Sequence, residues 1–275
     1  MIVNTHSTPF AFSDSSSKHT DSNQRADTQK NIELPDPFPI RKKRGIADTQ
    51  SLWPQHSTVK ISLIDMSDKQ RELTKTNILK WQPYINLKLE FIDTADGDIR
   101  IGTKPDGLGG GWSRVGTDAK NEKPSWNTMA ISFINDPKED GRIIQHEFGH
   151  ALGIKHEHRH PDNPLMYNRQ KIEMEYGKFG TNEFFTKIPA GDSTKLTPYD
   201  SRSIMHYHLP ENYMSNGITN TENYTLSTGD KYLAENLYPP KNKSDRRVFL
   251  TKNLKGSFGT YEWALAEKHA GAPQE

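Results

Sequence analysis

Two histidines four residues apart do most to restrict the folds open to this chain. In His146-Glu147-Phe148-Gly149-His150, both imidazoles lie on one face of an α-helix, one turn apart, where they can bind a single metal ion. Glu147 is displaced around the helix, so its carboxylate can reach a water on the metal rather than the metal itself. This H-E-x-x-H arrangement is typical of zinc proteases that use the glutamate as general base, although the five residues alone also occur by chance on solvated helices.

The residues after His150 favour a third ligand. Gly153 follows His150 by three residues, where the end of a helix favours a residue that tolerates left-handed backbone angles. The chain can turn there and bring His156 back towards the first two histidines. Three protein ligands leave a fourth position open for water, as in catalytic rather than structural zinc sites. The spacing of His158 and His160 does not fit this pattern, so we expect them at the surface or beside the ligands.

The extended spacing from His146 to His156 resembles the metzincin clan of zinc proteases, and the residues around it resemble the astacin family. Ser203-Ile204-Met205-His206-Tyr207 matches the Met-turn of that family, and Glu157 directly follows the third histidine. The resemblance extends over roughly residues 50–239. Its other parts are Leu52-Trp53-Pro54, residues 110–116 (GGWSRVG) and Thr197-Pro198-Tyr199-Asp200.

The resemblance implies a fold and a cofactor. The fold is α+β, of the two-subdomain metzincin type, with a mixed sheet and two long helices in the N-terminal subdomain. A mostly irregular C-terminal subdomain follows, and a zinc cleft lies between the two. The cofactor is one catalytic Zn²⁺, held by His146, His150 and His156. Gly153 and Met205 support the site, the latter as a hydrophobic base under the metal.

The resemblance also implies the reaction. Glu147 acts as general base on a metal-activated water that attacks the peptide bond, so we expect a zinc endopeptidase. Tyr207 is the second catalytic residue, a movable additional ligand of the metal that swings away to hold the transition-state oxyanion. The strand that contains Trp112 and Ser113 is the edge along which the substrate lies, since an exposed strand edge pairs with extended peptides.

Two other functions remain open from the sequence. The same site could belong to a catalytically silent, zinc-containing module that binds peptides or acts as an effector. It could also belong to an interaction protein whose function lies in its two tails. Glu147 and Tyr207 argue against both, because binding alone requires neither residue.

Apolar periodicity predicts the elements around the histidine motif. Ile144, Phe148 and Ala151 or Leu152 give the motif helix an apolar face towards a sheet. Alternation predicts strands over residues 59–63, 87–91, 98–101, 112–116 and 129–133. Further helices are predicted from the capping box Ser67-x-x-Gln70 to Trp81, over residues 168–179 and 181–187, and from Ser227 to Leu237.

The chain divides into three parts. Residues 1–44 are rich in Ser, Thr, Asn, Gln and Asp, so we expect a disordered N-terminal extension or a propeptide. This part ends in Arg41-Lys42-Lys43-Arg44, which is either a processing site that frees Gly45 or a solvated basic linker. By the resemblance, a freed Gly45 amine could pair with Glu157. The catalytic domain then spans residues 45–240, and residues 241–275 form a C-terminal tail.

Composition limits the partners. The net charge of +1 gives no reason to expect nucleic acid or a membrane surface, and no apolar run is long enough to span a bilayer. The expected partner is a protein or peptide substrate, and the expected state is a monomer. The absence of cysteine excludes disulfides and is similar to the bacterial and fungal branch of the family. Residues 1–14 do not have the pattern of a classical signal peptide, so we expect either a cytoplasmic protein or secretion by a non-classical or dedicated route.

Overall fold

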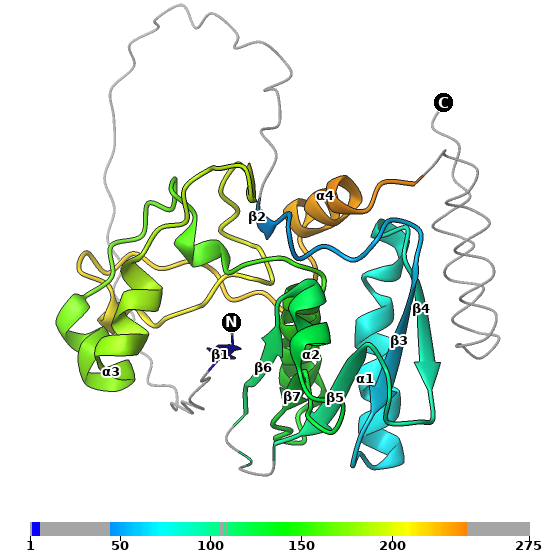
Figure 1. Cartoon of the computed structure of the whole chain (residues 1–275). Coiled ribbons are helices and arrows are strands. Elements are labelled where there is room, and N and C mark those ends of the chain that lie inside the picture. Colours follow the sequence, from blue (N-terminus) through cyan, green and yellow to red (C-terminus); the bar gives the residue numbers. More distant parts are fainter. Residues whose placement is uncertain (1, 6–44, 105–106, 108, 241–275) are drawn as a thin grey trace, which may run out of the picture.

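The computed structural model describes residues 2–5, 45–104, 107 and 109–240, and Figure 1 shows their arrangement. Six strands form one mixed sheet: β1 (Ile2–Thr5), β3 (Thr58–Leu63), β4 (Lys88–Ile92), β5 (Ile99–Thr103), β6 (Gly111–Arg114) and β7 (Met129–Ile131). Their order in space is β1-β6-β7-β5-β3-β4. The four strands from β7 to β4 are parallel, whereas β6 runs antiparallel to β7 and β1 antiparallel to β6. The sheet is therefore mixed, as predicted.

Helix α1 (Asp68–Leu79) begins at the predicted capping box. The Ser67 hydroxyl accepts a hydrogen bond from the Gln70 N–H, and the Gln70 side chain accepts one from the Ser67 N–H. The helix ends at Leu79, short of the end that the apolar pattern predicts. Trp81 lies on the turn that follows, where it is buried and its indole N–H donates to the Gln145 carbonyl.

Helix α2 (Pro137–Ala151) contains the histidine motif. Asp136 caps its N-terminus, because the Asp136 carboxylate accepts hydrogen bonds from the N–H groups of Lys138 and Glu139. The helix ends at Ala151, and Gly153 has a φ of 90°, which residues with a Cβ atom rarely adopt. The chain turns there, in agreement with the prediction, and the Lys155 N–H binds the Ile46 carbonyl as the chain returns.

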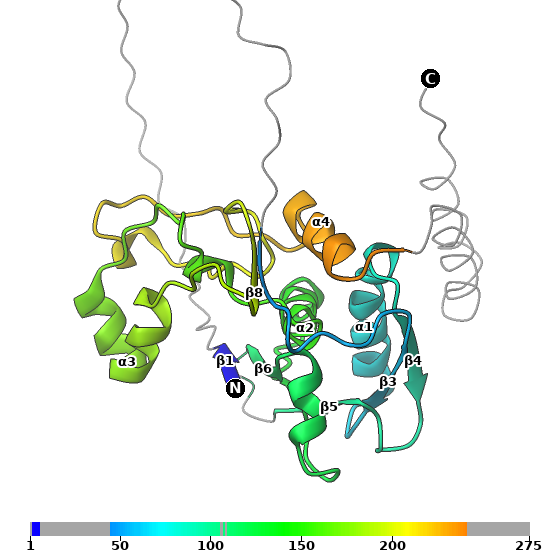
Figure 2. The same ribbon diagram turned by 45° about the horizontal axis from the view of Figure 1, so that its top comes forward.

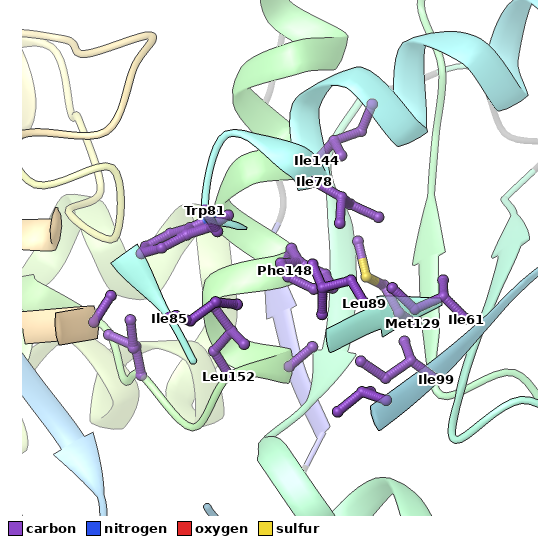
Figure 3. Packing of buried hydrophobic residues seen from close by; sticks show 14 of the residues in the cluster. Ile61, Ile78, Trp81, Ile85, Leu89, Ile99, Met129, Ile144, Phe148 and Leu152 are labelled. Carbon is purple, nitrogen blue, oxygen red and sulfur yellow. The ribbon is translucent and has the colours of Figure 1, made fainter. Parts of the chain in front are cut away.

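The two helices share one hydrophobic core with the sheet (Figure 3). Ile78 of α1 and Ile144 and Phe148 of α2 are fully buried. They pack with apolar side chains of the strands, among them Ile61 and Ile99. Burial of each such side chain stabilises the fold by about 1.5–3 kcal/mol. Because this packing fixes α2, it also fixes the histidines that α2 carries.

The C-terminal half contains α3 (Arg169–Phe185), β8 (Thr194–Thr197) and α4 (Thr228–Leu237). Strand β8 forms a small antiparallel sheet with β2 (Gly45–Asp48), which lies at the start of the expected catalytic domain. The two short helices predicted over residues 168–187 form one element, α3, which is broken at Gly177. Figures 1 and 2 place α3 on the opposite side of α2 from α1, and α4 beside β2. Irregular segments connect these elements, so the α+β fold of the metzincin type is confirmed.

Strand β1 lies within the N-terminal segment that we expected to be a disordered extension or a propeptide. It pairs with the outer edge of β6, with Val3 opposite Ser113 and Asn4 opposite Trp112. The strand that we predicted as the substrate edge is therefore covered in this structure. The remainder of the N-terminal segment, with Arg41-Lys42-Lys43-Arg44, lies outside the described residues, and so does the C-terminal tail over 241–275.

In the parts of the chain that the structure describes, none of the helices combines the length and apolar character that a bilayer span demands.

Candidate metal and catalytic site

Three histidine side chains converge at the end of α2. His146 and His150 come from successive turns of the helix, and His156 joins them after the turn at Gly153. The Nε2 atom of His156 lies 3.2 Å from that of His146 and 3.0 Å from that of His150. Two nitrogens bound to one tetrahedral zinc ion at roughly 2.0–2.1 Å are about 3.3 Å apart, so these separations fit a shared ion.

The hydrogen bonds of His146 and His150 leave a lone pair free on the Nε2 atom of each ring. Nδ1 of His146 lies 2.7 Å from the Ile204 carbonyl, and Nδ1 of His150 lies 2.7 Å from the Ile154 carbonyl. A carbonyl only accepts, so each Nδ1 carries the proton and each Nε2 presents a lone pair. Burial lowers the pKa of His150 to about 4 and holds the pKa of His146 and His156 well below the usual value. Three neutral, buried histidines whose Nε2 atoms converge fit a bound cation.

Glu147 is fully buried beside these histidines on α2. Its side chain lies against the backbone of Gly111 in β6, where a Cβ atom at position 111 would come within 2.7 Å of the Glu147 Cγ atom. This is well inside the roughly 3.5–4.0 Å of a favourable carbon–carbon contact, so only glycine leaves room for the glutamate. The predicted base and the predicted substrate strand are therefore in direct contact.

Replacing Gly111 with alanine is expected to lower kcat/KM for peptide hydrolysis by about 10²-fold, because the new methyl group collides with the Glu147 side chain at 2.7 Å and with the Ala130 carbonyl of β7 at 2.8 Å. Zinc content measured on the same protein is expected to stay at the wild-type level, and circular dichroism checks the fold. The matched control is Gly191→Ala, since a Cβ atom at that glycine meets open space. Wild-type activity of the Gly111 variant would contradict the close fit between Gly111 and Glu147.

The Met-turn lies beside the same helix. Met205 is fully buried, and any side chain at Gly149 of α2 would collide with its sulfur atom. The Glu157 N–H donates to the Met205 carbonyl at 3.0 Å, which ties the turn to the segment after the third histidine. The structure thus places Met205 next to α2, where the resemblance implies a hydrophobic support.

Tyr207 lies among the rings of the site. Its ring centroid is 4.3 Å from that of His156 and 4.5 Å from that of His158, with which it stacks at 15°. Phe184 of α3 packs against the same group, 5.4 Å from Tyr207 and 5.0 Å from His158. The structure therefore brings Tyr207 to the histidine cluster, and the C-terminal half of the chain supplies part of its surroundings.

His158 and His160 are both buried, so the surface position that we considered for them is wrong. His158 lies beside the predicted ligands, in contact with Tyr207. His160 Nε2 lies 2.5 Å from the Thr197 carbonyl. Neither belongs to the histidine cluster that could hold a metal among the described residues. Polar side chains such as these are buried when the folded chain supplies partners that their local sequence does not reveal.

Asp230 contacts the Met-turn, and the sequence analysis did not predict this contact. Its buried carboxylate, at the start of α4, accepts hydrogen bonds from the Ser203 hydroxyl and the Ile204 N–H. The spacing Ser227-x-x-Asp230 is a signal for the helix start, and both residues form a capping box there. Nothing in the local sequence indicates that the same carboxylate also reaches residues 203 and 204.

Asp230 is expected to make stability depend on pH. Burial raises the pKa of its carboxyl to about 6, above the value of 3.8 for an unfolded chain. The folded protein therefore holds this proton more tightly, and the stability that results is present below pH 3.8 and lost as pH rises through about 6. Asp230→Asn remains neutral, so we expect it to gain stability relative to the wild type as pH rises from about 4 to about 7.

Urea unfolding of both proteins in the presence of a chelator measures this difference. The exposed Asp192→Asn is the control and is expected to show no such trend. A stability difference between wild type and Asp230→Asn that stays constant over this range would contradict the raised pKa.

Comparisons with known proteins agree with this geometry. The sequence model of the astacin peptidase family matches residues 45–236. The chain is 29% identical over 158 residues to zinc metalloproteinase nas-38 of Caenorhabditis elegans, covering 55% of this chain and 19% of that protein. It is 28% identical over 172 residues to protein SpAN of Strongylocentrotus purpuratus, covering 61% of this chain and 26% of that protein. The chain thus spans about a fifth to a quarter of these curated relatives.

A solved structure of myroilysin has a similar fold. It superimposes with a TM-score of 0.65 at 27% identity, and the match covers 72% of this chain and 100% of that chain. A second structure of myroilysin superimposes with a TM-score of 0.53 at 26% identity, covering 69% of this chain and 86% of that chain.

Proposed function

Because this chain belongs to the astacin family of peptidases, we propose that it is a zinc endopeptidase with Glu147 as its general base. One observation supports this most strongly: the Nε2 atoms of three buried histidines converge at 3.0 and 3.2 Å beside the buried glutamate. We propose His146, His150 and His156 as the zinc ligands. A site with three protein ligands has an open position, as catalytic zinc requires.

The side chains divide the chemistry between them. Zinc bound at this site supplies Lewis acidity and lowers the pKa of a water ligand to about 7. Glu147 takes a proton from the attacking water and passes it to the leaving amine, and such proton transfer typically contributes about 10²–10⁴-fold. Tyr207 donates its hydroxyl proton in a hydrogen bond to the developing oxyanion, and it is also proposed as an additional ligand before substrate binds.

We propose that the substrate is an extended peptide that pairs with β6 near Trp112 and Ser113. Backbone pairing to a strand edge gives affinity without demanding a particular sequence. The antiparallel pairing of Ile2–Thr5 with β6 supports the proposal, because an extended segment already occupies this edge. A substrate that binds in this way must displace β1.

The test is cleavage of a mixture of unrelated peptides by the purified protein, alone, with a zinc chelator, and after zinc is restored. Cleavage that the chelator abolishes and zinc restores is the expected result. The full chain is compared with a chain that begins at Gly45, which lacks β1, and the shorter chain is expected to cleave faster. If both chains bind zinc and peptides but cleave none of them, the protein is a zinc-containing peptide-binding module instead.

A further inference from the structure

The buried carboxylate of Asp230 makes three hydrogen bonds. Its Oδ1 atom accepts from the Ser203 hydroxyl at 2.6 Å. Its Oδ2 atom accepts from the Ile204 N–H at 2.8 Å and from the Ser227 N–H at 2.8 Å. A buried carboxylate is costly unless it is hydrogen-bonded, and these three donors offset much of that cost. Two of the three come from the Met-turn rather than from α4, to which Asp230 belongs.

These bonds connect Asp230 to a proposed zinc ligand through one residue. Ile204 is held at both ends, since its N–H donates to Asp230 and its carbonyl accepts from Nδ1 of His146 at 2.7 Å. The Ser203 hydroxyl that donates to Asp230 also accepts from the Met205 N–H at 3.0 Å. One carboxylate therefore fixes the backbone of three consecutive residues of the Met-turn, including the carbonyl that orients His146.

We propose that Asp230 is a positioning residue for the zinc site, which acts by holding the Ile204 carbonyl against Nδ1 of His146. The inference rests on the proposed function, because it takes His146 to be a zinc ligand. The group that accepts the second ring proton of a ligand histidine fixes the tautomer and the orientation of the ring. Helix α4 thus contributes to metal binding although it supplies no ligand.

A simpler role for Asp230 is to cap α4. In that role it needs only the contacts with Ser227, whose N–H donates to its Oδ2 atom and whose hydroxyl accepts from the Asp230 N–H at 2.9 Å. Ser227→Ala removes the hydroxyl from this cap, together with the hydrogen bond that this hydroxyl donates to Asp200 Oδ2 at 2.7 Å. It leaves the Asp230 carboxylate on Ser203 and Ile204. An experiment can therefore distinguish the capping role of Asp230 from its positioning role.

The experiment measures zinc affinity by competition with a chromogenic chelator, on full-length protein shown by circular dichroism to be folded. Asp230→Ala is expected to bind zinc about 10–100-fold more weakly than the wild type. Asp230→Asn is expected to stay within about threefold, because its amide oxygen can accept from Ile204 while its NH₂ group faces Ser203. Ser227→Ala is expected to lower the melting temperature of the metal-free protein and leave the zinc affinity unchanged.

If Asp230→Ala does not fold, Ser203→Ala replaces it in the measurement. This variant removes the bond to Oδ1 and the acceptor of the Met205 N–H, and we expect at least about threefold weaker zinc binding. A folded Asp230→Ala variant with the zinc affinity of the wild type overturns the proposal. If Asp230→Ala does not fold, a Ser203→Ala variant with the zinc affinity of the wild type overturns it instead. A wild type that binds no zinc overturns the proposed function as well, so the two failures are distinguishable.

Discussion

Glu147→Gln is expected to lower kcat/KM for peptide hydrolysis by at least about 10²–10⁴-fold, with the zinc content unchanged at about one ion per chain. The amide has nearly the shape of the carboxylate but cannot accept the proton of the attacking water at neutral pH. Glu147 is fully buried beside the three histidines and is not one of the three proposed ligands, so its loss leaves the metal in place. Steady-state cleavage of a reporter peptide and zinc analysis of the same sample provide the measurement.

Glu139→Gln is the matched control for this experiment. It makes the same chemical change on the same helix, in the first turn of α2, where Glu139 pairs with Arg142 at 2.9 Å. We expect it to retain wild-type activity. If Glu147→Gln cleaves the reporter as fast as Glu139→Gln does, another group is the base and the assignment of Glu147 is wrong.

His150→Ala is expected to weaken zinc binding on the order of 10²–10³-fold and to abolish peptide hydrolysis at ordinary zinc concentrations. This magnitude follows from an apparent 10–16 kcal/mol for a zinc ion with four protein ligands, or about 3 kcal/mol for each ligand. In the folded chain His150 already presents its Nε2 lone pair, because its Nδ1 donates to Ile154. Zinc competition and activity with increasing zinc are the measurements.

The control for this prediction is His158→Ala. His158 is as deeply buried as His150 and lies two residues from His156, but it is outside the histidine cluster. Truncation at either position leaves a similar cavity, so a general loss of stability affects both variants. Equal loss of zinc in both would mean that the defect comes from packing rather than from ligation.

The parts of the site that could be predicted from sequence depend on local spacing. Histidines four apart share a helix face in any α-helix, and a glycine three residues later allows the turn that returns His156. The capping box at Ser67 is likewise a local signal, and α1 begins where it predicts. The apolar spacing predicts the end of α1 too late, because Trp81 continues that spacing although it lies on the next turn.

The remaining features depend on contacts between distant segments. The pairing of Ile2–Thr5 with β6 joins residues more than a hundred positions apart, and the polar composition around the first of them favours disorder. The burial of His158 depends on Phe184 of α3, and the reach of Asp230 depends on how α4 packs beside residues 203 and 204. Local periodicity carries no information about contacts between segments that are distant in the sequence.

The position of α2 within the core bears on how its backbone amides exchange hydrogen with solvent. Ile144 and Phe148 are fully buried between α1 and the sheet (Figure 3). They belong to the same turns of α2 as the proposed ligands and the proposed base. We therefore expect the amides of α2 to exchange with solvent by global unfolding rather than by local fluctuation. Zinc that binds only the folded chain would shift the folding equilibrium of the whole domain, so we expect it to slow exchange throughout the core as well as at the site.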